Sequence, residues 1–207
     1  MNEKKNFDCL LPKTRKLLEL MIDTAPFLSN YVFVGGSALA LHICHRKSED
    51  LDFFTYREGV FDKQEIRKYI GRFDSRVILN ESDEQIDLLI DGVKVTFFDA
   101  KWKFLEPSHI AVFNLATIES IAAMKVNVLF LRAKYRDYYD LYCLSKSISL
   151  RKIFECSRGV VEGLTYKLFC TSLLYIDDIV DDNIDHLEPQ EKISKKQIQE
   201  FFEKRMK

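Results

Sequence analysis

Two aspartates within an apolar run constrain this chain more than any other feature of its sequence. Asp50 and Asp52 flank Leu51 and precede Phe53 and Phe54. Residues i and i+2 of a strand point to the same face, so the two carboxylates are expected side by side, about 6–7 Å apart. Such a pair repels itself unless a cation lies between its members. The pair therefore predicts a divalent metal site for Mg²⁺ (or Mn²⁺), because hard cations prefer oxygen ligands.

A glycine–serine turn precedes these acids, between an expected strand at Tyr31–Val34 and an expected helix at Ser37–His45. Gly35 and Gly36 let a ligand approach the backbone closely. A helix N-terminus offers free N–H groups and partial positive charge to a phosphate, and the Ser37 hydroxyl adds a donor. Alone, the turn also fits an ordinary helix start, and the acids fit a solvated strand face. Together they predict a site for a nucleoside triphosphate (NTP) and its metal ions.

The spacing of these motifs resembles a known signature. The string GGS is followed, after a dozen residues, by DLD. This spacing resembles the signature of the DNA polymerase β-like nucleotidyltransferases. The longer string GGSALALHICHRKSEDLDFF is similar to the AbiEii/AbiGii toxin-type nucleotidyltransferases, in which Arg-x-Ser precedes the acids; Arg46 and Ser48 stand there. The resemblance implies that Asp50 and Asp52 are catalytic metal ligands. It implies nucleotide-binding roles for Gly35, Gly36, Ser37, Arg46 and Ser48.

A second segment, Leu115–Leu144, resembles another signature of the same family: a lysine, an arginine seven residues later, then two aspartates three apart. On a helix, Lys125 and Arg132 fall on one side, roughly 10 Å apart along the axis. The resemblance implies that Lys125 is catalytic and that Lys125, Arg132, Asp137 and Asp140 bind the nucleotide. A lysine that covers the edge of the core and an Arg136–Asp140 ion pair are the structural alternatives.

One position departs from the superfamily pattern. A third carboxylate often stands on a later strand, but Thr96 occupies that place in VKVTFF. Three nearby acids are possible substitutes: Asp87, Asp91 and Asp99. The sequence leaves open whether one of them serves, whether an acid of the helical half does, or whether activity is reduced or absent.

The pattern of elements predicts an α/β (α+β) fold. A nucleotidyltransferase mixed-sheet core with flanking helices is expected over residues 1–110. A helical domain that completes the nucleotide site is expected over residues 111–207. Asp91-Gly92 marks a two-residue hairpin between strands at Ile86–Ile90 and Val93–Phe98.

Composition excludes some functions and sets the expected compartment. With 31 basic and 32 acidic residues the net charge is −1, so RNA contact would need a local basic patch. The helix with Arg67, Lys68, Arg72 and Arg76 and the basic C-terminal helix are the candidates. No apolar run reaches the roughly 18 residues that span a bilayer. The five scattered cysteines are expected to be free thiols that act as small buried apolar residues in a reduced cytoplasmic protein.

The function predicted from these residues is metal-dependent transfer of a nucleotide from NTP to an acceptor hydroxyl. The resemblance implies a toxin of a bacterial toxin–antitoxin system, with an antitoxin protein as partner and RNA or tRNA as acceptor. Two alternatives stay open. One is a nucleotide-binding protein without transfer activity, and the other is a nucleotidyltransferase for a small molecule or a protein.

Overall fold

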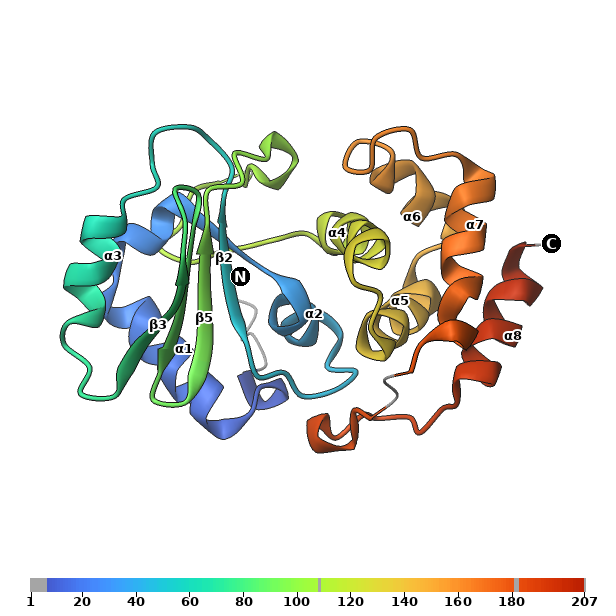
Figure 1. The fold of residues 1–207 in the computed structure, drawn as a ribbon, viewed down its shortest axis with the longest axis horizontal. Helices are drawn as coiled ribbons and strands as arrows, with labels where there is room; N and C mark the ends of the chain where they lie inside the picture. Colours follow the sequence, from blue (N-terminus) through green and yellow to red (C-terminus); the bar gives the residue numbers. More distant parts are fainter. Residues whose placement is uncertain (1–6, 108, 181–182, 207) are drawn as a thin grey trace. The chain divides into compact units, whose positions relative to one another are not determined.

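The computed structural model describes residues 7–107, 109–180 and 183–206. The chain divides into two compact units (Figure 1), Met1–Thr117 and Ile118–Lys207. The first is called the sheet unit and the second the helical unit. The predicted α/β class is confirmed, with a mixed sheet flanked by helices.

The sheet unit is built on six strands in the order β3-β4-β5-β2-β1-β6. Strands β1 and β2 are antiparallel, whereas β2 with β5 and β1 with β6 are parallel. Its elements in chain order are α1 (Pro12–Thr24), β1 (Tyr31–Val34), α2 (Gly35–Ile43), β2 (Leu51–Thr55), α3 (Lys63–Ile70), β3 (Arg76–Glu81), β4 (Gln85–Ile90), β5 (Val93–Phe98) and β6 (Asn114–Leu115).

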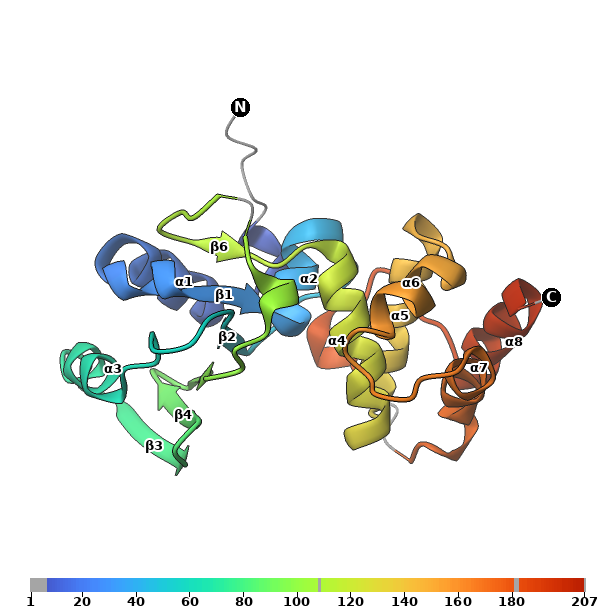
Figure 2. The ribbon, with the colours of Figure 1, turned by 90° about the horizontal axis from the view of Figure 1, so that it is seen from above.

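The two faces of the sheet differ in chemistry. One face carries an aromatic ladder that crosses β1, β2 and β5, in which the rings of Phe33, Phe53 and Phe97 follow each other at 5.2 Å between centroids. Helices α1 and α3 lie on this side and α2 lies on the other, as Figures 1 and 2 show. Because side chains alternate along a strand, Asp52 must point to the α2 side when Leu51 and Phe53 are buried.

The helical unit consists of five helices in its described part: α4 (Ile118–Leu131), α5 (Tyr135–Ser147), α6 (Leu150–Ser157), α7 (Tyr166–Leu174) and α8 (Lys195–Met206). Helices α5, α6 and α7 begin where side-chain caps or a capping box are present; Ser149 and Thr165, for example, accept hydrogen bonds from Lys152 and Leu168 backbone N–H groups. None of the described helices has the length and apolar character needed to span a bilayer.

The expectation that all five cysteines are free thiols is wrong. Cys9 and Cys44 form a disulfide with their Cα atoms 5.3 Å apart. They are 35 residues apart in sequence, but a parallel bridge between Leu10 and Ser48 brings their segments together. Cys143, Cys156 and Cys170 are free. Burial raises the pKa of the Cys143 thiol to about 12, which keeps it an unreactive apolar group.

Candidate active site

The glycine–serine turn and the acid pair (Asp50 and Asp52) meet in the sheet unit. Strand β1 ends at Val34, whose register partner on β2 is Asp52. Gly35 follows with φ at +77°, and a Cβ built on it would lie 2.5 Å from Asp52 Oδ2. A glycine is needed here for two reasons, since the backbone is left-handed and the carboxylate occupies the space of a side chain.

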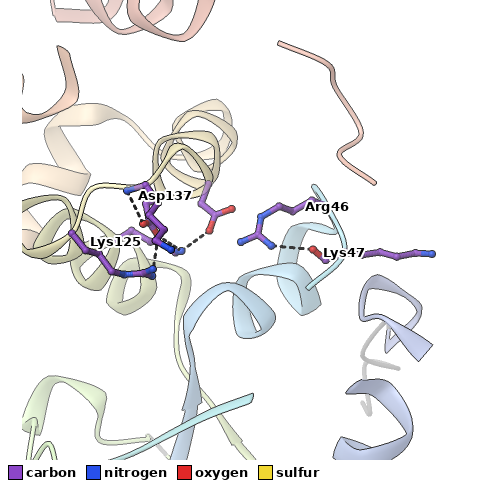
Figure 3. Close-up of polar contacts among 7 residues, drawn as sticks. Arg46, Lys47, Lys125 and Asp137 are labelled. Atoms are coloured by element: carbon purple, nitrogen blue, oxygen red, sulfur yellow. Dashed lines mark hydrogen bonds and ion pairs between the residues drawn. The ribbon is translucent and has the colours of Figure 1, made fainter. Parts of the chain in front are cut away.

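Arg46 and Ser48 close the other side of the turn. A Cβ on Gly36 would lie 2.7 Å from Arg46 Nη2 and 3.3 Å from Ser48 Oγ. Both side chains are buried, at 3% and 5% exposure, and Arg46 Nη1 donates to the Lys47 carbonyl at 2.9 Å, which Figure 3 shows. The Arg-x-Ser segment therefore presents a fixed guanidinium and a hydroxyl beside the start of α2.

Ser37 connects the turn to the acid pair in a way that the sequence did not predict. Its side chain is 1% exposed, and its hydroxyl donates a hydrogen bond to the backbone carbonyl of Asp50. This bond ties the first turn of α2 to the residue before β2. The first backbone N–H groups of a helix have no partner within that helix, so the main chain of the turn is the part suited to hold an anion.

The donor set of the acid pair fits a hard divalent cation. Carboxylates are the oxygen ligands that such ions prefer, and water and phosphate oxygens commonly complete the coordination. The Asp52 carboxylate lies beside Gly35, and Asp50 stands immediately before β2. No group of three or more His, Cys, Asp or Glu in the described residues is placed to hold a metal by itself. A metal ion held by the acid pair would therefore need further ligands from water or from a bound substrate.

The four residues of the second motif also come together, within the helical unit. Lys125 of α4 lies between two carboxylates of α5, with Nζ 2.9 Å from Asp137 Oδ1 and 2.5 Å from Asp140 Oδ2. Figure 3 shows Lys125 and Asp137 facing each other. Arg132 Nη2 lies 3.5 Å from Asp137 Oδ1. We call Lys125, Arg132, Asp137 and Asp140 the helical cluster.

Burial divides the helical cluster into an inner and an outer part. The side chains of Asp137 and Asp140 are fully buried and that of Lys125 is 7% exposed, whereas that of Arg132 is 42% exposed. Asp137 also accepts a hydrogen bond from the Lys134 N–H at 3.3 Å, at the start of α5. The lysine is therefore held by two acids rather than lying over the core edge, and Arg132 is the cation nearest to solvent.

Comparison with known proteins identifies the family to which the chain belongs. The family model described as the nucleotidyl transferase AbiEii toxin of a type IV toxin–antitoxin system matches residues 16–112 and 93–162. The chain belongs to the AbiEii nucleotidyltransferase family. It is a nucleotidyltransferase, as the sequence predicted. Both motifs lie inside the matched region.

Two other proteins are similar to this chain over nearly its whole length. The uncharacterized protein aq_aa25 of Aquifex aeolicus (strain VF5) is 26% identical over 204 residues, which cover 96% of each chain. A proposed nucleotidyltransferase from H. pylori has a similar structure, with a TM-score of 0.57 and 21% identity over 94% of this chain and 98% of that one.

Two other solved structures share the fold. MenT4, a nucleotidyltransferase toxin from Mycobacterium tuberculosis H37Rv, has a TM-score of 0.54 and 16% identity over 93% of this chain and 84% of its own. The antibiotic-resistance factor ANT(2″)-Ia has a TM-score of 0.54 and 14% identity over 72% of this chain and 92% of its own. At such identities these structures show the fold alone.

Gly35 offers a test of the contact between the turn and the acid pair. Gly35→Ala should be more destabilising than Gly59→Ala, although the two glycines have similar φ of +77° and +72°. The control costs about 1–2 kcal/mol of left-handed strain, and nothing lies within 4 Å of its added Cβ. Gly35→Ala must also displace the Asp52 carboxylate. Equal losses of unfolding free energy in urea titrations would contradict the contact.

Lys125 offers a test of the helical cluster. Lys125→Met should destabilise the helical unit by about 3–5 kcal/mol, because two buried carboxylates lose their partner. The control Arg151→Ala removes an exposed pair with Glu155 and should cost less than about 1 kcal/mol. Hydrogen exchange of α4 and α5 measures both. If Asp137→Asn and Asp140→Asn do not restore protection to Lys125→Met, uncompensated charge is not the cause.

Proposed function

We propose that this chain transfers a nucleotide from a magnesium-bound or manganese-bound NTP to an acceptor hydroxyl and releases pyrophosphate. One observation carries the proposal. The carboxylate of Asp52 fills the space beside Gly35 that a side chain would take, so the anion-binding start of α2 adjoins the metal-binding start of β2. A triphosphate and its metal ion are the ligand that needs both.

Each candidate site residue of the sheet unit has a defined role in the proposed reaction. The backbone N–H groups of Gly35, Gly36 and Ser37 hold phosphate oxygens, because a helix N-terminus attracts anions. Arg46 and Ser48 add a charge and a donor from the opposite side of Gly36. Asp50 and Asp52 hold the metal ion. When bound, the ion neutralises charge that develops on the phosphates and aligns the reacting groups.

The helical cluster is proposed to act on the same nucleotide. Lys125 is the proposed catalytic cation, and Asp137 and Asp140 fix its ammonium group by two short contacts. Arg132 keeps 42% of its side chain exposed and presents a forked donor suited to phosphate oxygens. In this proposal Arg132 presents positive charge to the substrate, and the two acids set the direction of the Lys125 ammonium group before the substrate binds.

RNA is the proposed acceptor, and the place of action is the cytoplasm, where NTP and RNA occur. The family is described as a toxin of a toxin–antitoxin system, so an antitoxin protein is the proposed partner. A net charge of −1 gives no long-range attraction for a polyanion. Of the basic residues expected on one helix, only Arg67 and Lys68 lie on α3, because α3 ends at Ile70; Arg72 follows it and Arg76 begins β3. Arg67 pairs with Glu81 and Arg72 stacks on Tyr69, whereas Lys68 is exposed.

Labelled substrates test the reaction and the acceptor together. Total bacterial RNA, Mg²⁺ and the protein are incubated with each NTP labelled on its α-phosphate or, separately, on its γ-phosphate. The α-label should enter a discrete RNA band at its 3′ end, and the γ-label should leave as pyrophosphate. Rising salt should reduce labelling steeply, because phosphate contacts release counterions.

Two charge reversals, one on the basic surface and one away from it, test RNA recognition. Lys68→Glu should reduce labelling of RNA, whereas Lys152→Glu, an exposed change in the helical unit, should not. Transfer of the α-label to a small molecule or a protein instead of RNA would overturn the RNA acceptor and leave nucleotidyl transfer standing. Transfer of the γ-label would contradict nucleotidyl transfer itself.

A further inference from the structure

A buried carboxylate in the middle of the sheet has no part in the site described so far. Asp87 of β4 is 7% exposed, and both of its oxygens accept hydrogen bonds. Thr96 Oγ1 donates to Oδ1 at 2.8 Å and Gln85 Nε2 donates to Oδ2 at 2.8 Å. Taking a charged group out of water is costly, and apolar residues of similar volume are often no less stable. Stability alone therefore gives little reason for an aspartate here.

The strand register places Asp87 in line with the acid pair. Asp52 is the register partner of Thr96 across β2 and β5, and Thr96 is the partner of Asp87 across β5 and β4. Residues in register share a face of the sheet, so these three side chains form one polar row on the side of α2. Neighbouring strands are about 4.8 Å apart. Thr96 thus lies one strand from Asp52, and Asp87 lies one strand beyond.

This geometry favours proton transfer over metal binding as the role of Asp87. Two strand spacings, roughly 10 Å between Cα atoms, separate it from Asp52. In the described chain it joins no cluster of three or more metal-ligating side chains. A threonine hydroxyl is both a donor and an acceptor. With its proton directed to Asp87, Thr96 keeps lone pairs that can receive a proton from another hydroxyl.

We propose that Thr96 and Asp87 form a proton relay for the acceptor hydroxyl, an inference that rests on the proposed function. The acceptor oxygen forms a bond to the α-phosphorus, and the bond from that phosphorus to the pyrophosphate oxygen breaks. The proton of the acceptor hydroxyl passes to Thr96 Oγ1, and the Thr96 proton passes to Asp87 Oδ1. Asp87 ends neutral and then releases its proton to solvent.

The relay gives each of the three polar side chains a separate role. Thr96 touches the reacting hydroxyl. Asp87 acts through Thr96, and Gln85 fixes the orientation of the carboxylate from its other oxygen. The carboxylate that receives the proton therefore lies on β4, one strand beyond the place of the usual third carboxylate on β5. Thr96, which stands at that place beside Asp52, connects Asp87 to the acceptor hydroxyl.

Four variants test the relay, because loss of the relay should lower kcat without changing substrate binding. Asp87→Asn and Thr96→Val should each lower kcat about 10²-fold, within the range for general base catalysis. Calorimetric affinity for Mg·NTP should stay unchanged. Thr96→Ser keeps the hydroxyl and should keep kcat. Because the two residues act in one path, the double variant should be no slower than either single variant.

A second threonine–aspartate pair of the sheet unit, between the end of β2 and the residue after β5, is the matched control. Thr55 Oγ1 donates to Asp99 Oδ1 at 2.9 Å, three residues along β2 from Asp52. Asp99→Asn should therefore leave kcat unchanged. Circular dichroism and thermal unfolding verify that each variant is folded. In Asp87→Asn, the further change Thr96→Asp places a carboxylate beside Asp52 and should recover part of kcat.

The assay uses a whole bacterial extract as the acceptor pool, so it does not depend on the acceptor being RNA. Wild-type kcat in folded Asp87→Asn or Thr96→Val would overturn the relay and leave nucleotidyl transfer standing. If the losses of kcat in the two single variants multiply in the double variant, the relay is also overturned. Absence of transfer by the wild type with every NTP would overturn the proposed function and the relay together.

Discussion

The register of β2 between β1 and β5 is the constraint on which the rest of the site depends. The aromatic ladder of Phe33, Phe53 and Phe97 holds these strands together on one face. A slip of one residue would send every side chain of β2 to the opposite face. Burial of Leu51 and Phe53 therefore directs Asp52 to the glycine turn, and the same register brings Thr96 beside Asp52. Packing on one face thus sets the chemistry of the other.

The helical cluster depends on a different balance. Two buried carboxylates are tolerable only because Lys125 contacts both and Arg132 approaches one of them. Removing one partner from such a group costs more than its net contribution to stability. The cluster is thus a fixed arrangement of charge, and its proposed role at a phosphate would use charges that are oriented before the substrate arrives.

Local patterns in the sequence predicted most of the fold. The strands Tyr31–Val34 and Val93–Phe98 match the observed bounds, whereas the helix expected at Ser37–His45 begins two residues earlier, at Gly35. The Asp91-Gly92 turn has positive φ at both residues, as the hairpin requires. Strand β6 was missed because two residues carry no periodicity, and its identity depends on pairing with β1.

Features that depend on long-range contacts could not be read from the sequence. The Cys9–Cys44 disulfide depends on the bridge between Leu10 and Ser48. Sequence patterns did not distinguish Asp87 from Asp91 and Asp99, because only the strand register pairs Asp87 with Thr96. Likewise, helical spacing placed Lys125 on a face but did not show that two aspartates of the next helix hold its ammonium group. The roles of these residues remain predictions.

The central claim is that the acid pair holds the metal ion that the nucleotide needs. The most direct measurement is Mn²⁺ binding by electron paramagnetic resonance with and without NTP, in the wild type and in the double variant Asp50→Asn, Asp52→Asn. The control changes Asp83→Asn and Glu84→Gln, outside the site. The account predicts NTP-dependent Mn²⁺ binding and nucleotide transfer in the wild type and the control, and neither in the acid-pair variant. Unchanged metal binding and transfer in a folded acid-pair variant would contradict it.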